Sequence, residues 1–252
     1  MLLSLPSIIR LPLPIHHITD ILSFYLGYRY YLSLRKRYGD TLPDTHRNIL
    51  IIGAAFGALI GSRLLASLEN LHAFFNPPSL LYYYANQTII GGIIGGIIGV
   101  EITKKTVGIR PSTGDLFVFP LMLGIAVGRI GCFLTGISDG TTGIPSKLPW
   151  ALDQGDGIMR HPTSLYEILF LGFLAIVLKQ LSQKKALKNG VLFRLFIIFY
   201  FLFRTGIECI KPVEHVLWQL SVTQIACLGV SGYYITTLFR DKALYTPTQT
   251  LS

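Results

Sequence analysis

Two groups of charged residues lie inside strongly apolar stretches of this sequence. Arg129 lies in LGIAVGRIGCFLTG, where glycines on both sides leave room for a bulky anionic partner. Tyr200, Arg204 and Glu208 are spaced four residues apart in FYFLFRTGIE, so a helix would place all three on one face. A charged side chain within a membrane span costs a few kcal/mol, so such residues usually belong to a functional site. The pattern predicts an arginine-lined polar cavity that binds an anion.

Both groups also have purely structural interpretations. Arg129 could pair with a carboxylate such as Glu208, and Arg204 and Glu208 could form an ion pair within one helix. An isolated pair facing lipid would be poorly compensated, which favours the interior cavity. Cys132, three residues after Arg129, is either a small packing residue or a nucleophile that Arg129 activates.

A third polar group enters a later apolar stretch, in RHPTSLYEILF. Arg160, His161 and Tyr166 lie at this membrane boundary, where an anionic lipid headgroup would be found. Tyr166 could equally be an interfacial anchor. Ser164 and Glu167 have the spacing of a helix capping box, which gives Glu167 a structural interpretation.

Three further features have open or structural interpretations. Arg63 could point into the cavity or extend toward the headgroups. Asp115 opens an apolar stretch, where an acidic residue complements the positive end of a helix dipole. Gly91, Gly95 and Gly99 recur on one face of GGIIGGIIGVE, a spacing that favours close helix packing over a phosphate site.

The composition requires a bilayer as solvent. Of 252 residues, 51% are hydrophobic and only 14% are charged, which is too apolar for a soluble domain. The net charge of +9 comes from short clusters between apolar runs, so we expect membrane topology and no nucleic-acid partner. No metal ion or organic cofactor is predicted, because the three cysteines have no metal-site spacing.

The positions of these runs predict an all-α integral membrane protein formed by a single domain, residues 1–252. Seven runs approach the roughly 20 residues that cross a bilayer; they are 15–34, 48–67, 86–103, 115–137, 163–181, 189–210 and 217–239. Lys and Arg concentrate after the first, third, fifth and seventh runs, and such basic loops stay in the cytoplasm. The N-terminus is therefore predicted outside and the C-terminus inside.

The motifs together resemble the prolipoprotein diacylglyceryl transferase family. The resemblance rests on GRIGCFLTG at 128–136, DG at 139–140, LPW at 148–150, RHPTSLYE at 160–167 and FYFLFRTGIE at 199–208. Asp115 also stands at the family's distance before Arg129. No single motif is decisive, but their order and spacing are specific.

The resemblance implies transfer of the diacylglyceryl group of phosphatidylglycerol, or of a similar anionic phospholipid, to the lipobox cysteine of a preprolipoprotein. It also implies a multi-pass protein of the bacterial inner membrane. Arg129 and Arg204 would hold the lipid phosphate and the leaving group. The candidate catalytic residues are Arg129, Arg204, Glu208, Tyr200 and His161. The candidate substrate-binding residues are Arg63, Arg129, Gly140, Arg160, Tyr166 and Asp115.

Three polar positions of the family are occupied differently here. The histidine that precedes the Gly-Gly pair is replaced by Ile94, or by Ile90 in the alternative match, and Cys132 and Ile137 replace an asparagine and an acidic residue. Two interpretations remain. Either a divergent enzyme forms the thiolate with Glu208 or His161 as base, or a non-catalytic lipid-binding or lipid-translocating protein keeps the cavity.

Overall fold

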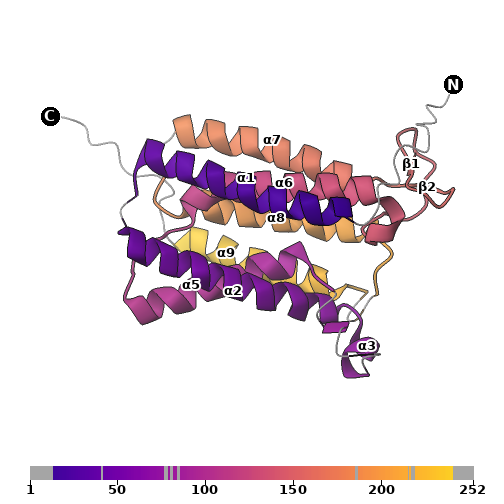
Figure 1. The fold of residues 1–252 in the computed structure, drawn as a ribbon, viewed down its shortest axis with the longest axis horizontal. Helices are drawn as coiled ribbons and strands as arrows, with labels where there is room; N and C mark the ends of the chain where they lie inside the picture. Colours follow the sequence, from indigo (N-terminus) through magenta and orange to yellow (C-terminus); the bar gives the residue numbers. More distant parts are fainter. Residues whose placement is uncertain are drawn as a thin grey trace.

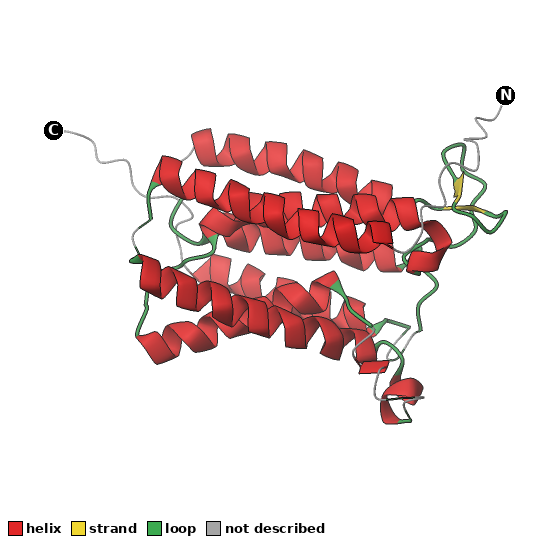
Figure 2. Cartoon of the chain, viewed as in Figure 1, coloured by secondary structure: helices red, strands yellow, loops and turns green. Residues whose placement is uncertain are grey.

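The computed structural model describes a protein that is almost entirely helical (Figure 2). The described residues are 14–40, 42–76, 79, 82–83, 86–184, 187–214, 216 and 219–240. The long helices are α1 (Pro14–Tyr38), α2 (Asp44–Leu68), α5 (Ile89–Val107), α6 (Val118–Thr135), α7 (Thr163–Lys184), α8 (Val191–Glu208) and α9 (Val222–Arg240). The short elements are α3 (Leu71–Phe75), the 3-10 helices η1 (Asp115–Phe117) and η2 (Gly136–Asp139), and strands β1 (Leu152–Asp153) and β2 (Met159–Arg160).

Four helical stretches are long and apolar enough to cross a membrane. They are Asp44–Leu68, Asp115–Asp139, Thr163–Gln183 and Val222–Arg240. Large apolar side chains on the outside, such as Phe24, Leu169 and Phe239, are 71–81% exposed. Because such a surface is unfavourable in water, the exposed residues favour a lipid surrounding. The expectation of a helical membrane protein is confirmed.

The helices form two groups that lie against each other. Figure 1 shows α1, α6, α7 and α8 in one group and α2, α5 and α9 in the other, with the described end of the chain at α9. Within the groups α1 packs on α6, α6 on α7 and α2 on α5, and the α8–α9 contact joins them. The buried core includes Phe196, Tyr200 and Phe201 of α8 and Leu171 and Leu178 of α7. Helix α8 is therefore central, which explains how its polar side chains avoid lipid.

The glycine run of α5 packs directly against α2, as its spacing predicted. A methyl group on Gly95 would collide with the carbonyl oxygen of Gly57, whereas one on Gly96 would meet nothing nearer than 3.6 Å. The two helices therefore approach as closely as their backbones allow.

We expect Gly95→Ala to destabilise the protein by about 1–3 kcal/mol, because the added methyl forces α2 and α5 apart. Gly96→Ala is the matched control, since it adds the same methyl where there is room. Thermal unfolding of the two variants in detergent measures the difference. Equal midpoints for both variants would show that the α2–α5 contact is not tightly packed.

Candidate functional site

Glu167, in the first turns of α7, is the centre of a buried polar cluster. Its carboxylate accepts a hydrogen bond from the Tyr200 hydroxyl at 2.6 Å. It forms ion pairs with Arg129 Nε at 2.9 Å and Arg204 Nη1 at 3.2 Å, and Arg204 Nη2 pairs with Glu208 at 2.6 Å. The side chains of Arg129, Arg204, Glu167 and Glu208 are each at most 6% exposed. The structure thus brings α6, α7 and α8 together around one carboxylate.

The charges of this cluster balance, but one buried hydrogen-bond donor has no described acceptor. Two guanidinium groups face two carboxylates, which compensates the cost of burying each ion. Among the described residues, the buried Nε of Arg204 has no hydrogen-bond acceptor. Because buried N–H groups are almost always satisfied, this donor favours an additional ligand with acceptor oxygens.

The structure decides between several interpretations of the sequence. Arg129 pairs with Glu167 and not with Glu208, and the ion pair between Arg204 and Glu208 within α8 does form. Glu167 points into the cluster, where it accepts a hydrogen bond from Tyr200. The spacing of Ser164 and Glu167 had suggested a helix cap, so this contact was not expected from the sequence. The ion-pair interpretation of Arg204 and Glu208 was right, and the pair belongs to a buried polar cluster. The arginine-lined cavity stays a prediction.

A second set of predicted residues gathers on the loop before α7. The His161 Nδ1 atom lies 3.2 Å from the hydroxyl of Tyr166, which accepts a hydrogen bond from Trp150 Nε1 at 2.8 Å. Arg160 forms an ion pair with Asp156 at 2.7 Å. Within the part of the chain that is described, no hydrogen bond or ion pair joins His161 or Arg160 to the Glu167 cluster. These side chains form a separate polar surface beside strands β1 and β2.

Two other predicted residues have local roles. Asp115 accepts hydrogen bonds from the backbone N–H groups of Gly190 and Phe193 at 2.6 and 2.9 Å, which caps the start of α8. Fourteen residues of helix, about 21 Å, separate it from Arg129, so the structure does not bring Asp115 to the cluster. Gly140 ends η2 with a left-handed φ of 68°, which suits a glycine.

Arg63 lies half-buried in α2, and its Nη1 atom donates to Ser62 Oγ at 3.4 Å. The apolar substitutions also have clear positions. Ile90 is fully buried in the hydrophobic core, and Ile94 packs against that core. Neither position offers a group that could accept a proton.

Sequence reasoning overlooked several polar residues that lie near this cluster. Arg129 Nη1 contacts the sulfur of Cys132 at 3.7 Å, and the same sulfur lies 3.7 Å from His16 Nε2. His16 in turn pairs with Asp20 and Asp139. The spacing of His16 and Asp20 by four residues was the available signal, because it places both on one helix face.

Lys211 comes three residues after the end of α8 and has a lowered pKa. Burial and the nearby guanidinium of Arg204 lower the pKa of Lys211 to about 8. An unfolded lysine has a pKa of about 10.4, so between these values the unfolded chain binds a proton that the folded chain does not. Stability therefore contains a contribution that rises with pH across this window.

We expect Lys211→Met to remove this rise. The measurement is the free energy of unfolding in detergent between about pH 7.5 and 10.5, where the two pKa values lie. The exposed Lys147→Met variant is the control and should keep the slope of the unmodified protein. An unchanged slope in Lys211→Met would contradict the burial of this amine.

Comparison with known proteins identifies the family of the chain. A family model described as prolipoprotein diacylglyceryl transferase matches residues 6–240. A relative from Methylococcus capsulatus is 31% identical over 191 residues, which cover 71% of each chain. A relative from Bordetella bronchiseptica is 30% identical over 224 residues, which cover 83% of each chain. A relative from Geobacter sulfurreducens is 29% identical over 208 residues, which cover 80% of this chain and 78% of the relative. All three relatives are named phosphatidylglycerol–prolipoprotein diacylglyceryl transferase. This chain therefore belongs to the prolipoprotein diacylglyceryl transferase family.

Proposed function

We propose that the protein transfers the diacylglyceryl group of phosphatidylglycerol to the thiol of a lipobox cysteine in a preprolipoprotein. The observation that carries the proposal is the convergence of Arg129 and Arg204 on one buried carboxylate in a member of this family. The names of the relatives supply the lipid donor and the prolipoprotein acceptor. The lipobox cysteine as acceptor atom follows from the family resemblance in the sequence.

The reaction is a nucleophilic substitution at carbon. The thiolate sulfur forms a C–S bond to the glyceryl carbon, the bond from that carbon to the phosphate oxygen breaks, and glycerol phosphate leaves with the electron pair. Negative charge grows on the phosphate as the bond breaks. Arg129 and Arg204 would stabilise this charge in a site of low dielectric constant, where oriented donors are most effective.

The surrounding residues would hold the two arginines ready for the phosphate. Glu167 fixes both guanidinium groups, and Glu208 fixes the second nitrogen of Arg204. Tyr200 donates to Glu167, which keeps the carboxylate in place. Arg204 Nε, which has no described acceptor, is the donor we assign to a phosphate oxygen.

We further propose that all seven long helices cross the membrane, with the N-terminus outside and the C-terminus inside. Besides the four apolar stretches, α1, α5 and α8 have 25, 19 and 18 residues. Two of the charged residues of α8, Arg204 and Glu208, are buried within the bundle and so do not face lipid. This topology would place the Glu167 end of the bundle at the outer leaflet of a bacterial inner membrane, where secreted preproteins emerge.

The test is a transfer assay with the purified full chain. Vesicles of phosphatidylglycerol with labelled acyl chains are incubated with a lipobox peptide, and the mass of the peptide is measured. We expect the mass to increase by one diacylglyceryl group, and a peptide with serine in place of cysteine to remain unchanged. Lipid that binds in an Arg129-dependent way without any transfer would overturn the proposal and support the lipid-binding alternative.

A further inference from the structure

A second cluster of ligand-type side chains lies beside Arg129. It contains His16 from α1, Cys132 from α6 and Asp139 from η2, whose donor atoms lie within 4.8 Å of one another. The Nε2 atom of His16 is 3.7 Å from the Cys132 sulfur and 2.9 Å from Asp139 Oδ1. These are a nitrogen, a sulfur and an oxygen that converge from three separate elements.

We propose that His16, Cys132 and Asp139 bind a zinc ion. Zinc takes imidazole nitrogen at about 2.0 Å and thiolate sulfur at about 2.3 Å in tetrahedral sites, which places neighbouring ligand atoms about 3.3–3.6 Å apart. The nitrogen–sulfur separation of 3.7 Å is about 0.1 Å longer than this range, and the nitrogen–oxygen pair needs to open by about 0.4 Å to reach it. A soft thiolate beside an imidazole selects zinc over calcium or magnesium.

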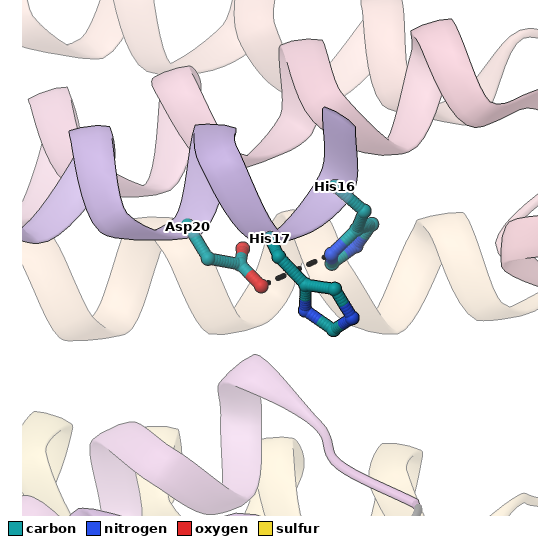
Figure 3. A group of neighbouring side chains, drawn as sticks. All are labelled: His16, His17 and Asp20. Carbon is teal, nitrogen blue, oxygen red and sulfur yellow. Dashed lines mark hydrogen bonds and ion pairs between the residues drawn. The ribbon is translucent and has the colours of Figure 1, made fainter. Parts of the chain in front are cut away.

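Two of the three ligands, His16 and Asp139, are each oriented by a further side chain. The Nδ1 atom of His16 pairs with Asp20 at 3.0 Å (Figure 3). This pairing leaves Nε2 to face Asp139. The Thr141 hydroxyl donates to Asp139 Oδ2 at 2.5 Å, so the other oxygen, Oδ1, faces His16. Such a carboxylate behind a ligating histidine is typical of zinc sites, because it fixes the tautomer and the ring orientation.

The charge of Arg129 is compatible with a cation in this place. Its Nη1 atom contacts the Cys132 sulfur at 3.7 Å, while its Nε pairs with Glu167 at 2.9 Å. The Glu167 carboxylate offsets the guanidinium charge, and a bound zinc ion would itself hold Cys132 as a thiolate. The thiolate and the Asp139 carboxylate together would neutralise a divalent ion.

Three protein ligands leave one position of a tetrahedral zinc ion open, as in catalytic zinc sites. We assign this position to the acceptor thiol, and this assignment, unlike the metal site itself, rests on the proposed function. The thiol sulfur would bind the ion, and the thiol proton would pass to a hydroxide ligand that leaves as water. No electrons are exchanged. A zinc-bound thiolate would fill the role of the base that Ile94 cannot supply.

The first test is metal binding by the purified full chain without a polyhistidine tag. After chelator treatment and equilibrium dialysis against Zn²⁺, we expect about one ion per chain, with binding lost in His16→Ala, Cys132→Ser and Asp139→Asn. His17→Ala should keep the ion. It separates the proposed site from the neighbouring group of His16, His17 and Asp20, whose donor atoms also lie within 4.8 Å of one another (Figure 3). Asp20→Asn should weaken binding roughly 10- to 100-fold. Absence of stoichiometric zinc, or equal binding by His16→Ala and His17→Ala, would overturn the proposal.

Cobalt replacement keeps the test valid if a variant folds poorly. Co²⁺ added to the unmodified chain should give a sulfur-to-metal absorption band that Cys132→Ser lacks. A lipobox peptide should strengthen this band, while a serine peptide should not. A protein without a cobalt–sulfur band contradicts the site.

The metal proposal and the proposed function can fail separately. One zinc ion per chain without any diacylglyceryl transfer would leave the site standing and refute the function. Full transfer by chelated, metal-free protein would leave the function standing and refute the acceptor thiol as the fourth ligand.

Discussion

Glu167→Gln is expected to destabilise the protein by about 3–5 kcal/mol and to abolish transfer. The substitution removes the charge that faces Arg129 and Arg204 and leaves two buried guanidinium groups uncompensated. Repulsion between the arginines would also displace them from a shared phosphate. Thermal unfolding in detergent measures the first effect, and the lipobox-peptide assay measures the second.

The matched control for this prediction is Glu101→Gln. Glu101 also pairs with a basic residue, Lys104 at 2.9 Å, but its side chain is 56% exposed. The Glu101 carboxylate already faces water, although Lys104 is only 11% exposed, so its loss should cost about 0–1 kcal/mol. This variant should unfold and react almost as the unmodified protein does. An equal loss of stability in both variants would show that burial does not make the Glu167 ion pairs stronger than the pair of Glu101 with Lys104.

Arg129→Ala should lower the turnover number of transfer by at least about 100-fold. Loss of one donor that stabilises a developing negative charge typically costs 10²–10³ in rate. Arg129→Lys should recover little of this activity, since an ammonium group cannot contact both Glu167 and a phosphate oxygen as a planar guanidinium does. The measurement is the rate of thioether formation at saturating phosphatidylglycerol.

Arg110→Ala is the control for the loss of one positive charge, because Arg110 is exposed and comes three residues after α5. Figure 1 shows that α5 ends on the side of the bundle away from strands β1 and β2 and the start of α7. We expect its turnover number to be unchanged. A turnover number of Arg129→Ala within threefold of the unmodified protein would show that Arg129 does not face the reacting phosphate.

The positions of the helices along the chain were largely predictable from hydropathy. Apolar runs of about 20 residues must form helices in a bilayer, because every backbone polar group needs an internal partner. The predicted run at 163–181 is α7 at Thr163–Lys184, and the run at 189–210 is α8 at Val191–Glu208. The run at 86–103 shifted to Ile89–Val107, because Thr88 caps the helix and Gly108 ends it. The number of spans and their orientation stay predictions.

The polar cluster was predictable only in part. Residues on one helix face, such as Tyr200, Arg204 and Glu208, follow from a spacing of four, and charge in an apolar run singles out Arg129. Glu167 was given another interpretation because Ser164 and Glu167 match a local capping pattern. Which carboxylate meets which arginine depends on how α6, α7 and α8 pack, and spacing within one helix contains no such information.

The contact between His16 and Asp139 beside Cys132 was even less predictable from the sequence. His16 and Asp139 are more than a hundred residues apart in the sequence, yet their side chains lie 2.9 Å apart. The contact exists because α1 packs along α6 and η2 follows α6 directly. Cysteine spacing could not indicate the zinc site that we propose, because two of its three ligands would not be cysteines and each comes from a different element.

The most direct test of the central claim compares two products of one reaction. Purified protein, phosphatidylglycerol vesicles and a lipobox peptide are incubated, and both glycerol phosphate and the thioether peptide are quantified. The account predicts equal amounts of the two products, with neither formed by Arg204→Ala nor from a serine peptide. Release of glycerol phosphate without thioether, or no release at all by folded protein, would contradict it.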